Sequence, residues 1–468
     1  MTSKVKVVVS TKDREFKLTP DSPLEIETSN GTNLHHELTA RINLDKKLHS
    51  FLGMGYSFEH TSCYNIMALE TPDRKRALEL LVDPEKGAGM NLWRLCIGTA
   101  DFTGTEWYSY LDEAPNMDLD GQDLLKYVED NFSIEKDMDL IIPVARQALD
   151  INPDIRFFAS PWSPPGWMKD TGTMCGGHLL SKYWDAYALY LALYVEAYQK
   201  IGLPIHAITV QNEPLHNVES MPSCKWNTKG TEERDFIKYH LGPTFKVRRL
   251  NTELWCFDHN WSLLGWLNLL RRPSRYPQTI LDDKEARKYV DGIAFHHYAA
   301  FGFSNPKMML KLREKYPDIP FYFTEGSLEY FWGSMRLPRY IKYGSSSING
   351  WVPMIDTEGR PNNGPFQTKH SMIQRKVPEN KIKINLDYYM YAQYSKYIKR
   401  GAKLLDVEIT RSRGFEFVAC MNPDKEVVAV ITNKRRKPRR LAISFYSQSL
   451  HVNLKAHSIT TLRWNLDE

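Results

Sequence analysis

The sequence predicts an α/β fold in which a (β/α)8 barrel carries an antiparallel β-sandwich at its side. Eight apolar runs between residues 49 and 355 are each followed by a helix-like or long connecting stretch. Strands that alternate with helices form a parallel sheet, and eight of them close into a barrel. Short alternating strands near both chain ends predict the sandwich. The 468 residues also exceed one ordinary barrel of about 250 residues, so large insertions or a second module are expected.

Most of the predicted barrel strands end in polar or aromatic residues. This pattern favours a site built from the carboxyl ends of many strands. A doubly wound open sheet would gather its ligand groups at one switch point and usually carry a glycine-rich phosphate loop, which this sequence lacks. The eight runs are 49–58, 91–102, 156–165, 205–214, 253–261, 291–298, 319–327 and 348–355.

Residues 181–201, SKYWDAYALYLALYVEAYQKI, predict a connecting helix. Ser181 suits an N-cap, and Gly202 suits the left-handed residue that ends many helices. We expect its many tyrosines to pack against the barrel rather than to bind a ligand. Asp185 and Glu196 exclude a membrane span for this segment.

Both chain ends differ from the middle in having short strands of alternating polarity. VKVVVST and LEIET lie within residues 4–47, and six such segments lie within residues 402–465. The later segment fits about seven antiparallel strands, which the N-terminal strands are expected to join. We therefore predict one discontinuous sandwich from residues 1–48 and 400–468, with the catalytic barrel at 49–399.

Composition predicts a soluble chain. No stretch of 18 apolar residues is present, and the N-terminal residues lack the apolar core of a signal peptide. The expected location is cytoplasmic, or secreted with the leader not shown. Six scattered cysteines form no Cys-x-x-Cys pair and have no histidine at ligand spacing, which argues against a structural zinc. Oligomeric state is left open.

The net charge of +5 has a local source in residues 433–440, NKRRKPRR, which carry six basic groups. This run lies between two strand-like segments, so we interpret it as the solvated connection of a hairpin. Binding to nucleic acid or to an anionic membrane is the alternative. We favour the turn and expect no nucleic-acid partner, because no aromatic residues are interleaved with the basic ones.

Two glutamates stand where predicted strands meet the rim of the barrel. The run IHAITVQNEP ends in Asn212-Glu213-Pro214, and the run IPFYFTEGS ends in Glu325-Gly326. Taken alone, Glu213 is equally explained as a solvated residue where a strand stops at a proline. Two carboxylates at strand ends of one barrel are, however, what glycoside cleavage needs. The pair predicts a glycosidase acting on a carbohydrate or glycoside.

The chain resembles glycoside hydrolase family 30, the family of lysosomal-type glucosylceramidase. The resemblance rests on motifs in the family's order, namely WRLCIGTADF, ASPWSPPGWMKD, TVQNEP, RDFIKYHLGP, IAFHHY, FTEGS and GWVPMIDTEGRPN. It implies a retaining β-glycosidase with Glu213 as acid/base and Glu325 as nucleophile, needing no metal or organic cofactor. Retention predicts carboxylates about 5–5.5 Å apart, against roughly 6.5–9.5 Å for inversion. We also expect Glu213 protonated and Glu325 ionised at working pH.

The resemblance also implies the residues of the sugar pocket. Asp101 would accept from sugar hydroxyls, Asn212 would donate to the 2-hydroxyl, and Tyr298 would orient the nucleophile. His296 either joins that network or is a core histidine satisfied by the backbone, and Trp226 is a candidate aglycone platform. The residues expected to line the pocket are Arg94, Asp101, Trp162, Asn212, Tyr298, Trp351 and Asn362.

The chain departs from the family pattern at two places, both expected on the rim. Gly53-Met54-Gly55-Tyr56 replaces a Gly-x-Gly-Gly turn and is followed by Glu59-His60. After the fifth strand, Asp258-His259-Asn260-Trp261 places a tryptophan where an arginine is expected. These changes concern the substrate and the outer subsites, not the two glutamates.

The predicted substrate is a terminal β-glucoside of the glucosylceramide type. A close alternative keeps the mechanism and changes the substrate, as in a β-xylosidase, a β-fucosidase or a β-1,6-glucanase. A non-catalytic carbohydrate-binding protein is the alternative from another class, although it would not need both acids.

Overall fold

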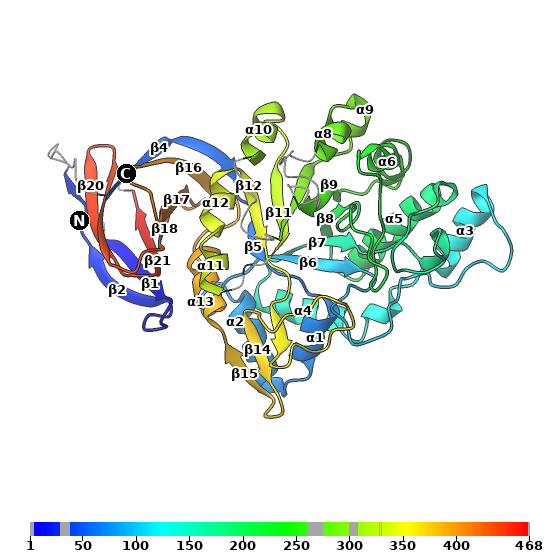
Figure 1. The fold of residues 1–468 in the computed structure, drawn as a ribbon, viewed down its shortest axis with the longest axis horizontal. Coiled ribbons are helices and arrows are strands. Elements are labelled where there is room, and N and C mark those ends of the chain that lie inside the picture. The colour runs from blue at the N-terminus through cyan, green and yellow to red at the C-terminus, as the bar shows by residue number, and fades with distance from the viewer. Residues whose placement is uncertain are drawn as a thin grey trace.

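A computed structural model describes residues 4–28, 38–260, 275–298, 308–326, 328 and 330–466. Its centre is an eight-stranded parallel sheet in the order β5-β12-β11-β10-β9-β8-β7-β6 (Figure 1). An isolated backbone bridge between Ser57, just after β5, and Arg94 of β6 brings the two edges of the sheet together, so the barrel is nearly closed. The strands are β5 (Gly53–Gly55), β6 (Leu92–Ile97), β7 (Arg156–Pro161), β8 (Ile205–Thr209), β9 (Glu253–Asn260), β10 (Gly292–His297), β11 (Phe321–Gly326) and β12 (Ser345–Asn349).

Helices connect these strands. The expected helix is α5, but it begins at Trp184, after a 3-10 turn over Ser181–Tyr183. Gly202 follows it with φ of 81°, the left-handed conformation expected there. The α-helices are α1 (His60–Met67), α2 (Thr71–Val82), α3 (Gly121–Asn131), α4 (Ile141–Ile151), α5 (Trp184–Lys200), α6 (Thr231–Phe236), α7 (Gly242–Val247), α8 (Tyr276–Leu281), α9 (Lys284–Arg287), α10 (Met308–Lys315), α11 (Tyr330–Ser334), α12 (Leu337–Lys342) and α13 (Leu386–Ser395). No helix in the described parts of the chain is long and apolar enough to cross a membrane.

The last barrel strand lies earlier than predicted. β12 spans Ser345–Asn349, and only its final residues fall in the predicted run 348–355. Three buried serines precede Ile348, so an apolar search misses the strand although all five of its residues are buried. The rest of that run enters β13 (Met354–Asp356), which forms a separate three-stranded sheet with β14 (Ile373–Lys376) and β15 (Lys381–Ile384).

The sandwich is built from both ends of the chain, as expected. One ten-stranded, largely antiparallel sheet runs in the order β2-β1-β21-β18-β17-β16-β4-β19-β20-β3, and the labelled N and C ends lie together beside it (Figure 1). It encloses its own apolar core, which includes Val7, Ile42 and Ile431. The division at residues 48 and 400 remains a prediction. The strands are β1 (Val5–Thr11), β2 (Thr19–Leu24), β3 (Glu27–Thr28), β4 (Leu38–Ser50), β16 (Lys403–Ile409), β17 (Phe415–Met421), β18 (Glu426–Asn433), β19 (Arg439–Phe445), β20 (Gln448–Leu454) and β21 (Ser458–Asn465).

The basic run 433–440 does not connect a hairpin, so that interpretation was wrong. It joins β18 to β19, but β18 pairs with β17 and β21, whereas β19 pairs with β20 and β4. The run therefore crosses between two parts of the curled sheet, and strand periodicity alone cannot distinguish such a crossing from a tight turn.

The barrel interior changes from apolar to charged along its axis. One interior layer contains Leu92, Phe158, Trp255 and Tyr322, with the last two rings stacked 3.9 Å apart. Further along the same strands, the buried side chains become charged, beginning with Arg94 on β6. The packed layer thus supports a polar site at the carboxyl ends of the strands.

Candidate active site

Glu213 and Glu325 lie close together at the carboxyl ends of barrel strands that are separated by β9 and β10. Glu213 follows β8, and Glu325 is the penultimate residue of β11. One carboxylate oxygen of each, together with a ring nitrogen of His296, falls within a group whose atoms are all within 4.8 Å of one another. Both glutamates are largely buried. The two acids found from separate strand ends therefore share one site.

Glu325 is held by two donors. Nη1 of Arg94 donates to its Oε2, and the hydroxyl of Tyr298 donates to its Oε1. Arg94 is completely buried, and its guanidinium also lies over the ring of Trp162, 4.7 Å from the centroid. A carboxylate with both oxygens accepting such bonds has little rotational freedom, so Glu325 presents a fixed oxygen to the site.

Asp258 organises the base of the site, although it was not among the predicted site residues. Its carboxylate accepts from Nη2 of Arg94 at 2.8 Å and from the hydroxyls of Thr209 and Thr324 at 2.7 and 2.6 Å. Nε2 of His296 lies 3.0 Å from its Oδ1. Burial would raise the pKa of Asp258, but the charges of Arg94 and His296 hold it well below its usual value. It is thus a permanent buried anion between two cations.

A β-bulge directs Asp258 into the barrel. Ala294 pairs with Phe257 and the next residue pairs with His259, so Asp258 is the extra residue in the register of β9 against β10. Its φ of 45° and the φ of 80° at Phe257 lie in the left-handed region, which is uncommon for residues other than glycine. Bulges and strained backbone of this kind are common beside functional sites, where they aim a side chain.

His296 lies between Asp258, at the bottom of the site, and Glu213, at the rim of the barrel. Its Nδ1 lies 3.0 Å from Oε1 of Glu213, while its Nε2 faces Asp258. Burial alone would lower its pKa, but the charges of Glu325 and Asp258 raise the pKa of His296 to about 10. Of the two possibilities that the sequence left open, the side-chain network is therefore the one observed.

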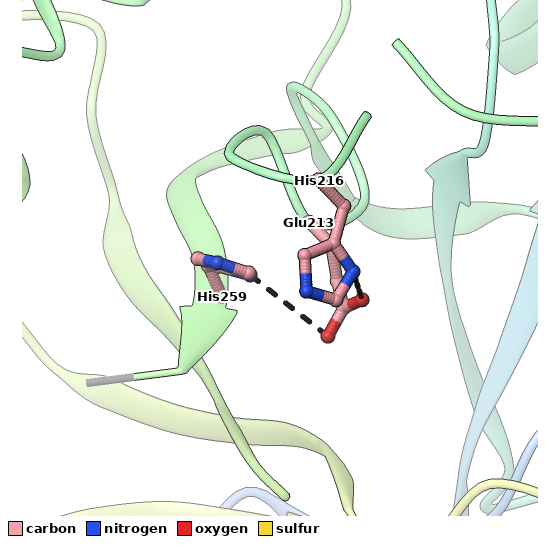
Figure 2. A group of neighbouring side chains, drawn as sticks. All are labelled: Glu213, His216 and His259. Atoms are coloured by element: carbon pink, nitrogen blue, oxygen red, sulfur yellow. Dashed lines mark ion pairs between the residues drawn. The ribbon is translucent and has the colours of Figure 1, made fainter. Parts of the chain in front are cut away.

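Glu213 is surrounded by imidazoles (Figure 2). Nδ1 of His216 lies 2.5 Å from its Oε2, and Nδ1 of His259 lies 3.8 Å from its Oε1. Burial would raise its pKa, but the contacts and charges of His216 and His296 hold the pKa of Glu213 well below its usual value. The expectation that its surroundings favour the protonated carboxyl is therefore wrong, because His216, His259 and His296 converge on this carboxylate in the fold.

The wall of the site is aromatic. Trp162, at the end of β7, stacks on Trp351 with ring centroids 4.9 Å apart. Asp101 follows β6 and is buried, and burial, with the charges of Glu325 and Glu213, raises its pKa to about 8. Flat apolar faces beside a polar acid suit a pyranose ring, whose C–H face packs on aromatics.

Comparison with known proteins decides the family. The family description "Glycosyl hydrolase family 30 TIM-barrel domain" matches residues 51–348, and "Glycosyl hydrolase family 30 beta sandwich domain" matches residues 401–462. The chain belongs to glycoside hydrolase family 30. It is therefore a glycosidase with a barrel and a β-sandwich, as the resemblance implied.

Among its family 30 relatives, the chain is 28% identical to an endo-1,6-beta-D-glucanase of Neurospora crassa, over 91% of this chain and 87% of the relative. It is also 28% identical to the lysosomal acid glucosylceramidase of Mus musculus, over 86% and 78% respectively. The solved structure of an endo-beta1,6-glucanase superposes with a TM-score of 0.86 at 26% identity, covering 99% of this chain and all of that one.

Two of the predicted site residues, Trp226 and Asn362, make contacts of their own within the fold. Trp226 is only 3% exposed and packs between Trp184 and Phe236, so it belongs to the core and cannot serve as an aglycone platform. Asn362 is buried, and its side chain bonds to Phe366 and Gly364 of its own loop. Asn362 therefore holds the loop in shape, and its contact with the sugar remains a prediction.

The departures from the family 30 pattern do not both lie on the rim. Glu59 is completely buried and caps α1, accepting from the backbone N–H of Ser62 at 2.7 Å. His259 is buried within β9 beside Glu213. Trp261 lies outside the described residues. The departure at Glu59 therefore has a structural role, whereas the departure at His259 places an imidazole beside Glu213.

Several residues of this family 30 site were not singled out from the sequence. His216 and His259 contact Glu213, and the hydroxyls of Thr209 and Thr324 support Asp258. Asp258 and His259 end the fifth predicted strand, so the strand-end criterion that selected Asp101 also applies to them. The two threonines give no comparable signal.

Proposed function

We propose that this chain is a retaining β-glycosidase in which Glu325 is the nucleophile and Glu213 the acid/base. The observation that carries the proposal is the separation of the two carboxylates, whose nearest oxygens lie within 4.8 Å. This closeness supports double displacement, since inversion needs roughly 6.5–9.5 Å to admit a water molecule. The fixed orientation of Glu325 by Arg94 and Tyr298 supports the nucleophile role.

The reaction proceeds in two steps. Glu325 attacks the anomeric carbon while Glu213 gives a proton to the glycosidic oxygen, so the aglycone leaves as an alcohol. Water then attacks the glycosyl-enzyme, with Glu213 as base, and the carboxylate of Glu325 is released. Asn212 accepts from Arg94 through Oδ1, so its amide group is the donor offered to the sugar's 2-hydroxyl.

The proton for the first step belongs to a coupled group rather than to Glu213 alone. Burial would lower the pKa of His216, but its contact with Glu213 and the charge of that residue raise it. When Glu213 and His216 share a proton, the pair loses it with an apparent pKa that describes both residues together and not either one alone. The imidazole thereby keeps a proton beside a carboxylate that would otherwise stay ionised.

The sugar proposed for the cleavage subsite is β-linked glucose. The relatives named above are an endo-1,6-beta-glucanase and a glucosylceramidase, and both names refer to a glucosyl linkage. The nearly complete coverage of the glucanase structure favours a β-1,6-glucan as substrate, with glucosylceramide as the second candidate.

A substrate panel with stereochemical readout tests the proposal. Aryl β-glucoside, β-xyloside and β-fucoside are compared with β-1,6-glucan and glucosylceramide, and the first-formed anomer is followed by proton NMR. We expect the β-anomer to form first and the highest kcat/KM for glucosyl substrates. An α-anomer formed first would overturn retention, and faster cleavage of the xyloside or fucoside would overturn the choice of sugar. The Glu325→Gln variant serves as the inactive control.

A further inference from the structure

The histidines around Glu213 form a group that the proposed reaction does not need in full. His296 is engaged on both nitrogens, whereas His216 and His259 offer Nδ1 atoms toward the same carboxylate (Figure 2). One ligand atom from each of Glu213, His216 and His259 lies within 4.8 Å of the others. We propose that these three side chains bind a divalent transition-metal ion of the zinc type, and that the bound ion reversibly inhibits the enzyme.

The donor spacing fits such an ion. Nδ1 of His216 and Nδ1 of His259 lie 2.5 and 3.8 Å from the two carboxylate oxygens of Glu213. Tetrahedral zinc with ligands at about 2.0–2.1 Å separates its donor atoms by about 3.3 Å. The two contacts, made to different oxygens of Glu213, fall on either side of that value, so the side chains must rotate to bring one oxygen and both nitrogens around an ion. Three protein ligands leave the fourth position for water.

The site is largely preformed. His259 is buried, and its Nδ1 has no hydrogen-bond partner among the described residues. The backbone N–H of Glu213 donates to the carbonyl of Asp258, and that of His216 donates to the carbonyl of Glu213, which fixes both ligands relative to the barrel. The side chain of His216 is 39% exposed, but its Nδ1 is buried on the side that faces Glu213. A bound metal ion would give the buried Nδ1 of His259 a partner and would also contact the carboxylate of Glu213.

The donor types select the class of ion. Two imidazoles and one carboxylate suit zinc and its transition-metal neighbours, whereas magnesium and calcium prefer oxygen ligands. The second group of possible ligands, which contains Glu213, His296 and Glu325, is less suitable. His296 would have to lose a proton that two carboxylates hold there, since each of its nitrogens faces an acid.

Inhibition rests on the proposed role of Glu213. A metal ion on this carboxylate removes the proton donor of the first step and the base of the second step. Metal ligands must be deprotonated, so the ion competes with the proton on His216. Metal affinity and inhibition should therefore both increase with rising pH.

The test measures binding and activity separately on the full chain, after treatment with a chelator. Zinc binding is followed by calorimetry at pH 5.5 and 7.5, with magnesium as the comparison ion. The ligand variants are His216→Ala and His259→Asn, and the matched control is His178→Ala, which removes a surface histidine paired with Asp170. Thermal melts establish that each variant is folded.

We expect one zinc ion per chain, bound at least about 10-fold more weakly at pH 5.5 and in either ligand variant, with the control unchanged. Zinc should lower the rate of the unmodified enzyme, and a chelator should restore it. Each variant is compared with its own metal-free rate, and both ligand variants should resist zinc. Equal zinc affinity in all variants, or equal affinity for magnesium, would overturn the site. Zinc bound at these residues with undiminished activity would instead overturn the acid/base role of Glu213.

Discussion

Nη2 of Arg94 lies 2.8 Å from Oδ2 of Asp258, and both side chains are completely buried. Arg94 also donates to Glu325, so this one cation links the structural anion at the base of the barrel to the proposed nucleophile. A buried ion pair contributes little net stability, but removal of one partner leaves an uncompensated charge. The geometry of the proposed nucleophile therefore depends on Asp258.

Replacement of Asp258 with Asn should be costly for both stability and activity. The change removes one buried counter-ion from Arg94 and His296, which keep only Glu325 and Glu213, and breaking a buried pair typically costs roughly 3–5 kcal/mol. The charge of Asp258 also raises the pKa of His296, so that pKa should fall. Urea unfolding and kcat/KM measure the two effects, with Asp170→Asn at the surface as control. Unchanged stability and rate would contradict the role of Asp258.

Replacement of His216 with Ala should move the alkaline limb of the pH–rate profile to lower pH. The pKa of His216 is raised by Glu213, so the pair keeps its last proton to a higher pH than Glu213 would alone. The loss should appear with an alkyl or sugar leaving group and be small with a dinitrophenyl glucoside, which needs little protonation. An equal loss for both leaving groups at every pH would indicate a purely structural role.

Replacement of Glu59 with Gln should stabilise the protein at alkaline pH. Burial raises the pKa of Glu59 to about 8, so between about pH 5 and 8 the folded state holds a proton that the unfolded state has lost. The free energy of unfolding therefore falls as pH rises through that window. Glutamine keeps the oxygen that caps Ser62 and cannot ionise.

Thermal melts at pH 5 and pH 8 measure the effect of this variant. The gain should be near zero at pH 5 and positive at pH 8, at about 1 °C per kcal/mol because the unfolding entropy grows with chain length. The control Glu285→Gln changes a surface residue paired with Lys288 and should show no such pH dependence. A stability gain of the same size at both pH values would refute the titration of Glu59.

Replacement of Trp226 with Ala should reduce stability rather than substrate affinity. The ring is 3% exposed and packs on Trp184 and Phe236, and truncation of a buried tryptophan typically costs about 3–5 kcal/mol. The comparison is Trp351→Ala in the site wall. This change should raise KM, and it should lower the free energy of unfolding less than Trp226→Ala does. A large rise in KM for Trp226→Ala with normal urea unfolding would restore the platform interpretation.

Sequence reasoning found the parts of this protein that have a local signal. Glu213 and Glu325 each end an apolar run, and the alternating segments of the C-terminal region became β16 to β21. Asp258 also ends a predicted strand, but its contacts with Arg94 and His296, which are distant in sequence, are visible only in the fold. β12 was missed because its buried residues are mostly serines, and the depressed pKa of Glu213 was missed because three histidines converge on it only in the fold.

The division of roles between the two glutamates is the central claim. Glu213→Ala should react with a dinitrophenyl β-glucoside and then stall, because the good leaving group needs no acid but the second step lacks its base. Glu325→Gln should lose activity on every substrate, by on the order of 10⁴-fold or more, and azide should restore turnover only in the Glu213 variant.

Mass spectrometry of the stalled Glu213→Ala variant tests this claim most directly. The account predicts one glucosyl unit per chain, attached to the peptide that contains Glu325, and its release by azide as β-glucosyl azide. A glucosyl unit on any other residue, or no adduct together with an α-configured product from the unmodified enzyme, would contradict it.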